Sequence, residues 1–205
     1  MKIHDTAIIG KNAYIGDNVE IGPYTIIGDN VAIGDGTKVY GHCSIGTPGE
    51  SIHDFPNESA GVTIGKNCTI REFVTINNNL GTFKTSVGDN CYLMSKSHMG
   101  HDAILRDNVV LCTGAKIGGH SLIDSFTYVG LNASTHQHAA VGKYCIIGAM
   151  GFFKGRSPDA VSWMGIPAKP KKVNLVNLIR NINDPNEIEK IRIEAQAFID
   201  QWDKG

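Results

Sequence analysis

The chain has 205 residues, with 19 lysines and arginines against 20 aspartates and glutamates, and a formal net charge of -1. This length can bury a core without disulfides or a metal, and the lack of excess positive charge argues against a nucleic-acid partner. No apolar run approaches the roughly 18 residues that span a bilayer, and the first residues lack the layout of a secretion signal, so we expect a cytoplasmic protein without a membrane span. Five cysteines, an odd number, fit reduced thiols better than a disulfide framework.

From its first residues the chain repeats every six positions. Aliphatic side chains recur from Ile3 to Ile45, from Ile64 to Ile76 and from Val87 to Ile147, with Thr135 as the one break in the last run. A six-residue period with two inward positions is typical of a left-handed parallel β-helix, in which three short strands make a coil of eighteen residues and coils stack about 4.8 Å apart. We therefore predict an all-β domain of hexapeptide repeats over residues 1–155.

Two segments leave the repeat and are predicted to be loops inserted into the β-helix. Residues 46–61 and 77–86 are rich in Gly, Pro, Asn and Ser, and the phase of the repeat shifts across them. Loops on a rigid scaffold commonly carry binding groups. Four of the five cysteines instead fall in the second inward position, which favours small residues, so we expect them to pack in the core: Cys43, Cys68, Cys91 and Cys145.

After Phe153 the repeat stops, and residues 156–205 are predicted to form an exit loop and a short C-terminal α-helical extension. The stretch 173–182 has the pattern of a short helix. A second helix is expected to begin with Asp184 as N-cap and Pro185 in the first helical position. Its apolar residues follow helical spacing, and we expect them to pack against the β-helix or a partner subunit.

Five of the eight histidines lie within 41 residues, and none occupies an inward position of the repeat: His98, His101, His120, His136 and His138. All five should therefore point outward. Because a coil has eighteen residues, Asp102, His120 and His138 are expected to form one outward column. Histidine can exchange protons near neutral pH, so this patch is a candidate site for acid–base chemistry. A zinc site is the alternative, but it needs three converging ligands, and the third would come from Asp102 or from another chain.

Four segments of the chain resemble the UDP-N-acetylglucosamine acyltransferases of lipid A and lipopolysaccharide biosynthesis: HMGHDAIL, IGGHSLID, THQHAAVG and VNLVNLIRN. The similarity covers most of residues 1–182. The spacings of 19 residues from His101 to His120 and of 35 from His101 to His136 match the active-site histidines of that family.

The resemblance implies a role for each matching residue. His101 would be the general base, Asp102 its supporting carboxylate, and the backbone N–H of Gly119 the donor to the oxyanion formed on a thioester. The side chains expected to contact the sugar nucleotide or the acyl chain are His98, His120, His136, Gln137, Glu50, His53 and Arg180. Ala149 and Met150, with Phe152 and Phe153 beside them, stand where the family leaves room for the end of the acyl chain, so we expect a donor shorter than that of the long-chain members. No metal site is implied.

Two departures from the family pattern leave the donor and the acceptor open. The segment TPGESIHD replaces the family's sugar-contacting loop, so that Glu50 and His53 are the candidates to substitute for its contacts. The segment MGIPAKPKK has the Gly-x-Pro-Ala-Lys pattern of hexapeptide acetyltransferases that use acetyl-CoA. A set of basic side chains could hold phosphates of the carrier protein, coenzyme A or the nucleotide, or could simply be solvated: Lys169, Lys171, Lys172 and Arg180.

The predicted activity is transfer of an acyl group from a thioester of acyl carrier protein or coenzyme A to a hydroxyl or amine of a nucleotide-linked sugar. We expect a homotrimer with active sites between neighbouring β-helices and no permanently bound cofactor. The nearest alternative is an acetyl-CoA-dependent N-acetyltransferase of nucleotide amino sugars. The other two are a metal hydratase resembling the γ-class carbonic anhydrases and a silent trimeric scaffold.

Overall fold

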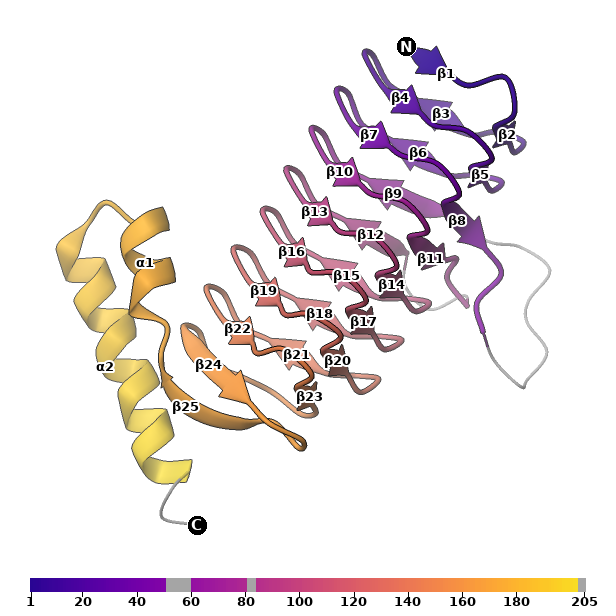
Figure 1. The fold of residues 1–205 in the computed structure, drawn as a ribbon. Coiled ribbons are helices and arrows are strands. Elements are labelled where there is room, and N and C mark those ends of the chain that lie inside the picture. Colours follow the sequence, from indigo (N-terminus) through magenta and orange to yellow (C-terminus); the bar gives the residue numbers. More distant parts are fainter. Residues whose placement is uncertain (51–59, 81–83, 203–205) are drawn as a thin grey trace.

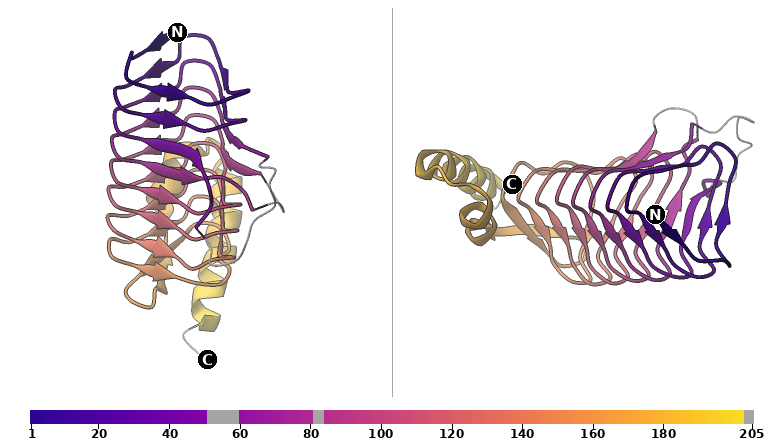
Figure 2. Two further views of the ribbon diagram at one scale, coloured as in Figure 1. Left: turned by 90° about the vertical axis from the view of Figure 1, so that its right-hand side faces the viewer. Right: turned by 90° about the horizontal axis from the view of Figure 1, so that it is seen from above.

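The structure is a computed structural model that describes residues 1–50, 60–80 and 84–202. Over these residues the chain winds into a left-handed parallel β-helix, whose short strands line up coil upon coil in three sheets (Figure 1). The fold class predicted from the repeat is therefore confirmed. The two helices lie beyond the last coil, away from the N-terminus (Figure 2).

The described residues contribute twenty-five strands to the three sheets. The first sheet consists of β1 (Lys2–Ile3), β4 (Glu20–Ile21), β7 (Lys38–Val39), β10 (Thr69–Ile70), β13 (Tyr92–Leu93), β16 (Val110–Leu111), β19 (Tyr128–Val129), β22 (Ile146–Ile147), β24 (Val161–Met164) and β25 (Lys169–Val173). The second consists of β2 (Ile8–Ile9), β5 (Ile26–Ile27), β8 (Ser44–Thr47), β11 (Thr75–Asn77), β14 (His98–Met99), β17 (Lys116–Ile117), β20 (Ser134–Thr135) and β23 (Phe152–Phe153). The third consists of β3 (Tyr14–Ile15), β6 (Ala32–Ile33), β9 (Val62–Ile64), β12 (Thr85–Val87), β15 (Ile104–Leu105), β18 (Leu122–Ile123) and β21 (Ala140–Val141).

The core is a set of apolar columns inside the coil. In most strands the aliphatic residue of the repeat points inward, and Ile27, Ile45 and Leu111 are fully buried. Each stacks on the equivalent residue of the next coil, as Ile27 does on Ile45. Burial of these columns is the main force that holds the coils together.

The corners between the sheets contain residues with left-handed backbone conformation. At one corner these include Asn12 (φ 55°), Asn30 (φ 56°), Asp102 (φ 57°), His120 (φ 57°) and His138 (φ 61°). Asn, Asp and His adopt this conformation more readily than β-branched residues do. The turn geometry thus fixes the backbone of three residues from the predicted outward column.

The second inward position carries buried hydroxyl and thiol groups that satisfy the backbone at the corners. Thr127 Oγ1 donates to the carbonyl of Gly142 at 2.7 Å and accepts from the N–H of Cys145 at 3.1 Å. The Cys145 thiol donates in the same way to the carbonyl of Pro158 at 3.2 Å. The four cysteines predicted to be inward are all buried, and burial raises the pKa of Cys43 and of Cys145 to about 11. The thiols of Cys43 and Cys145 therefore stay protonated at neutral pH and act as packing groups and donors.

The chain after residue 155 differs from the exit loop expected there. β24 continues the first sheet in parallel with β22, and β25 then turns back antiparallel to β24. These strands have four and five residues and lie outside the six-residue pattern, so the periodicity could not reveal them. Trp163 of β24 is buried edge-on against Phe153, with ring centroids 4.7 Å apart, and covers the last coil of the core.

The helical extension consists of α1 (Leu175–Asn181) and α2 (Pro185–Trp202). As predicted, Asp184 caps α2, because its carboxylate accepts a hydrogen bond from the N–H of Asn186 at 2.9 Å. α2 packs against β25 and buries Ala195. Within the described part of the chain, neither helix is long and apolar enough to cross a membrane.

Replacing Thr127 with valine keeps the side-chain shape but leaves two buried backbone groups without a partner. We expect the free energy of unfolding to fall by about 1–3 kcal/mol for each of these groups. Thr69→Val, at an outward strand position, is the matched control and should change stability by less than about 0.5 kcal/mol. Urea denaturation followed by circular dichroism measures both variants, and equally small shifts would show that the Thr127 hydroxyl does not stabilise the coil.

Candidate active site

The clustered histidines gather where β14, β17 and β20 of the second sheet turn towards the third sheet. A pocket of about 390 Å³ opens beside these strands, and six of the predicted site residues line it: Glu50, His98, His101, Gly119, His136 and Gln137. A larger hollow of about 450 Å³ at the N-terminal coils contains none of the clustered histidines.

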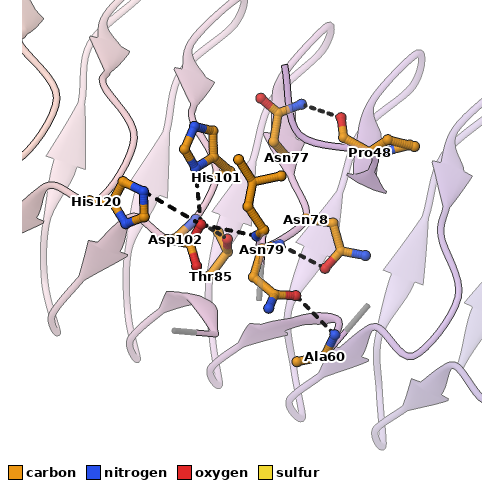
Figure 3. A network of polar contacts seen from close by, with 10 residues as sticks. Pro48, Ala60, Asn77, Asn78, Asn79, Thr85, His101, Asp102 and His120 are labelled. Carbon is orange, nitrogen blue, oxygen red and sulfur yellow. Dashed lines mark hydrogen bonds and ion pairs between the residues drawn. The ribbon is translucent and has the colours of Figure 1, made fainter. Parts of the chain in front are cut away.

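His101 and Asp102 form a hydrogen-bonded pair at the wall of this pocket (Figure 3). His101 Nδ1 lies 2.9 Å from Asp102 Oδ2. Because an ionised carboxylate only accepts hydrogen bonds, Nδ1 carries the imidazole proton and Nε2 keeps its lone pair. A neutral imidazole held in this way can accept a proton from a ligand in the pocket.

Asp102 lies beside His101 and His120, as the column predicts, but its carboxylate has no exposed surface. Leu80, which follows β11, contacts it. The N–H of Leu80 donates to Asp102 Oδ2 at 3.0 Å, and the N–H of Asp102 donates to Thr85 Oγ1 at 2.8 Å (Figure 3). The first bond orients the carboxylate towards His101, and the second holds the backbone of Asp102 in place.

His120 and His138 continue the column above Asp102, as the repeat predicts. Their rings stack with centroids 4.6 Å apart and planes 4° from parallel. His120 Nε2 is 3.9 Å from Asp102 Oδ2, too far for a hydrogen bond. Burial lowers the pKa of His120, and the attraction of Asp102 offsets this only in part, while His101 and His138 lower it further. His120 is therefore neutral at pH 7.

His98 is a second imidazole that burial keeps neutral. Its Nδ1 is 2.8 Å from the hydroxyl of Thr75 in the adjacent strand. Burial lowers the pKa of His98, Glu50 opposes this effect, and the positive charge of Lys116 reinforces it. The other ring nitrogen remains available to a ligand.

Gly119 occupies a corner position of the coil and has an open backbone N–H. At several equivalent positions this N–H donates to a carboxylate one coil further on, as Lys143 does to Asp159 at 2.7 Å. The residue one coil beyond Gly119 is Gln137, and within the described residues the Gly119 N–H has no hydrogen-bond acceptor. A Cβ at Gly119 would lie 2.7 Å from Cε1 and 2.8 Å from Nε2 of His101, so only glycine leaves the imidazole in place.

Three further predicted site residues are His136, Glu50 and His53. His136, whose Nδ1 is 3.1 Å from the carbonyl of Gln137, lies edge-on to Phe152 with ring centroids 6.2 Å apart. Glu50 is exposed at the rim of the pocket. His53 lies outside the described residues.

Arg180, Ala149 and Met150 do not line the histidine pocket of the same chain. Arg180 belongs to α1 and borders a separate hollow of about 490 Å³. Phe152 and Phe153 were both expected beside the end of the acyl chain; Phe152 lines the histidine pocket and Phe153 does not. Phe153 follows the inward phase of the repeat and is fully buried in the core.

Asn77, Lys116 and Thr135 also line the pocket, and sequence reasoning missed them. Lys116 could have been found, because it lies one coil beyond His98 and pairs with it in register. Asn77 could not, since the insertion after β11 changes the number of residues between paired positions.

One group of described residues has the donors and spacing to hold a metal ion: the ligand atoms of His101, Asp102 and His120 all lie within 4.8 Å of one another. Two imidazoles and a carboxylate are a donor set found in catalytic zinc sites. However, His101 Nδ1 and Asp102 Oδ2 are hydrogen-bonded to each other and would have to change partners to bind a cation. As it stands, the arrangement is suited to proton transfer.

Known proteins similar to this chain are acyltransferases. The family model described as bacterial transferase hexapeptide (six repeats) matches residues 1–31. The acyl-(acyl-carrier-protein)–UDP-N-acetylglucosamine O-acyltransferase of Campylobacter concisus is 33% identical over 198 residues, covering 94% of this chain and 74% of the relative. That of Campylobacter curvus is 36% identical over 204 residues, covering 97% and 76%.

Solved structures give the same result. UDP-N-acetylglucosamine O-acyltransferase from Moraxella catarrhalis superimposes with a TM-score of 0.80 at 27% identity, covering 94% of this chain and 82% of that one. The Francisella novicida acyltransferase gives 0.78 at 32% identity, covering 93% and 73%. Together, the fold, the histidine pocket and these similarities define a hexapeptide-repeat acyltransferase. The chain belongs to the acyl-(acyl-carrier-protein)–UDP-N-acetylglucosamine O-acyltransferase family.

The neutral histidines should make the protein sensitive to acid. The pKa values of His98 and His120 are lowered in the folded protein, so the unfolded chain takes up protons first as the pH falls. Their contribution to stability is complete above the ordinary histidine pKa near 6.5 and is lost as the pH drops below about 6.5. His98→Gln should flatten this loss in denaturation curves, whereas His4→Gln, on the surface, should not. Identical pH slopes for the wild type and His98→Gln would contradict the assignment.

Proposed function

We propose that the protein transfers an acyl group from acyl carrier protein to a hydroxyl of UDP-N-acetylglucosamine, with His101 as general base. The observation that carries this proposal is the pairing of His101 with the buried Asp102, 2.9 Å apart, next to the open N–H of Gly119. The names of the relatives support the two substrates.

In this mechanism His101 Nε2 takes the proton of the sugar hydroxyl while the oxygen attacks the thioester carbonyl. The carbonyl oxygen becomes an oxyanion, and the N–H of Gly119 donates a hydrogen bond to it. Collapse of the tetrahedral intermediate breaks the carbon–sulfur bond, and the departing thiolate receives the proton from His101. Asp102 keeps the Nδ1 proton in place and stabilises the imidazolium that forms between the two steps.

The other pocket residues would bind the substrates. His98, His136, Gln137 and Glu50 line the pocket with groups suited to the hydroxyls and amides of a nucleotide sugar. Lys169, Lys171 and Lys172 are exposed on the last strand and are candidates to bind the phosphates of the carrier protein.

We further propose that the enzyme is a homotrimer whose active sites lie between neighbouring subunits. Arg180 borders a hollow distinct from the pocket of His101, so the two residues do not line one pocket within a chain. Cyclic packing of identical β-helices would place the Arg180 hollow of one copy beside the histidine pocket of the next. Ala149 and Met150 would limit the acyl chain in the same way, from outside the pocket of their own chain.

His101→Ala should lower kcat by about 10²–10⁴-fold, the usual contribution of a general base. The protein should remain folded, because the imidazole lies at a pocket wall and its loss leaves no core cavity. Turnover of UDP-N-acetylglucosamine with acyl carrier protein thioester measures this, with His4→Ala as the control for losing a surface imidazole. Wild-type turnover by folded His101→Ala would refute His101 as the base.

Mixing two inactive variants tests whether subunits share a site. If each site joins His101 of one subunit to Arg180 of the next, trimers that combine His101→Ala and Arg180→Ala chains contain some intact sites. After unfolding and refolding an equal mixture, about a quarter of the sites should recover. Light scattering should give three times the chain mass of 22.1 kDa. A stable monomer, or no recovery from a mixed trimer, would contradict the shared site.

A further inference from the structure

Asn77, the last residue of β11, has a buried oxygen whose hydrogen-bonding capacity is unused. The side chain lines the same pocket as His101, and the residue is only 4% exposed. Among the residues that the structure describes, none donates a hydrogen bond to Asn77 Oδ1. Buried polar atoms in proteins rarely lack a partner, so such an atom at a pocket wall indicates a group that meets its partner in a ligand.

The direction of the Asn77 amide is fixed by its other contact. Asn77 Nδ2 donates to the backbone carbonyl of Pro48 at 3.2 Å. A carbonyl can only accept, so the NH₂ group must face Pro48 and the oxygen must face the other way. Figure 3 shows the amide oxygen turned away from Pro48, on the side of His101.

The side-chain oxygens of the two following asparagines both have partners within the protein. Asn78 donates to the carbonyl of Gly46 at 3.4 Å and accepts from the N–H of Asn79 at 2.9 Å. Asn79 Oδ1 accepts from the N–H of Ala60 at 2.9 Å. Structural demands of the loop therefore account for these two side-chain oxygens, and they do not account for that of Asn77.

We propose that Asn77 Oδ1 accepts a hydrogen bond from an O–H or N–H group of the acceptor sugar and so determines which sugar is accepted. This rests on the proposed function. The reacting end of a thioester has only acceptor atoms, so it cannot satisfy Asn77, whereas a sugar carries several donors. A site with a buried acceptor discriminates strongly against a ligand that lacks the matching donor, because the acceptor then remains unpaired.

Two substitutions at Asn77 separate this role from a structural one. Asn77→Ala loses the oxygen and the bond to Pro48, and should raise KM for UDP-N-acetylglucosamine by about 5–20-fold while KM for the thioester stays unchanged. Asn77→Asp also loses the NH₂ donor but keeps an acceptor on either rotamer, and should recover most of the affinity. If Asn77 only holds the loop, the aspartate would be worse than alanine, since it faces the Pro48 carbonyl.

Asn78→Ala is the matched control. It removes two hydrogen bonds of the same loop but no acceptor from the pocket, and should leave both KM values near those of the wild type. Calorimetric titration with UDP-N-acetylglucosamine should show the same order of affinities without turnover. Equal affinities for wild type and Asn77→Ala would overturn the proposal.

Substrate analogues identify the donor. Three analogues of UDP-N-acetylglucosamine each lack one donor: the 4-hydroxyl, the 6-hydroxyl or the acetamido N–H. With one of these analogues, the KM of the wild type should rise by the same factor by which Asn77→Ala raises KM for UDP-N-acetylglucosamine. With that analogue, Asn77→Ala should cause no further rise in KM. Independent losses with every analogue would refute the contact. A wild type that does not acylate UDP-N-acetylglucosamine refutes the proposed function, whereas normal turnover with unchanged Asn77→Ala refutes only this inference.

Discussion

Stacking of each residue on its equivalent in the next coil is the constraint on which the site depends. Met99 pairs with Ile117 in parallel register, and a slip by one residue would turn an apolar column out into water. Burial therefore fixes the register to the single residue. The same register places Gly119 beside His101 and sets the distance of His120 from Asp102, although none of these residues contributes to the core. The geometry of the pocket thus follows from packing on the opposite side of the strand.

The chemistry is concentrated where this regular pattern is broken. The corner N–H of Lys143 is engaged by an aspartate of the next coil, whereas at Gly119 the equivalent residue of the next coil is Gln137 and no such contact forms. Asp102 would be solvated at a regular corner, but the Leu80 and Thr85 contacts enclose it. At each of these irregular positions a polar group is either open to a ligand or held in a fixed orientation. The surrounding coils are too well packed to shift.

The parts of the fold that depend on local spacing could be predicted from the sequence. A six-residue period specifies strand positions, inward side chains and the burial of cysteines such as Cys145, because each coil contacts only its neighbours. The clustering of the histidines was predicted from the same spacing, with eighteen residues in each coil. The predictions that failed concerned positions affected by insertions or segments outside the six-residue repeat. Thr75 pairs with His98, 23 residues away, so neither the burial of Asp102 nor the position of Asn77 could be read from an eighteen-residue coil.

The strands β24 and β25 were not predicted, for a related reason. They extend the first sheet through backbone hydrogen bonds, which any sequence can form, and their side chains carry no hexapeptide signal. Arg180 lies on a helix whose position depends on these strands. The spacing of motifs along the sequence therefore could not predict that Arg180 is separate from the histidine pocket, although the motif that contains Arg180 was recognisable.

The five histidines are not equivalent, and Asp102 is what distinguishes them. Its Oδ2 accepts from the N–H of Leu80 and lies 2.9 Å from His101, but 3.9 Å from His120. A direct hydrogen bond to a carboxylate stabilises an imidazolium more than proximity alone does, and of these two rings only that of His101 has such a bond. The lowered pKa of His120 fits this division, since burial outweighs the attraction of Asp102 at the longer distance. Within the proposed mechanism, His101 alone is equipped to hold the transferred proton, and the neighbouring neutral rings can bind substrate without competing for it.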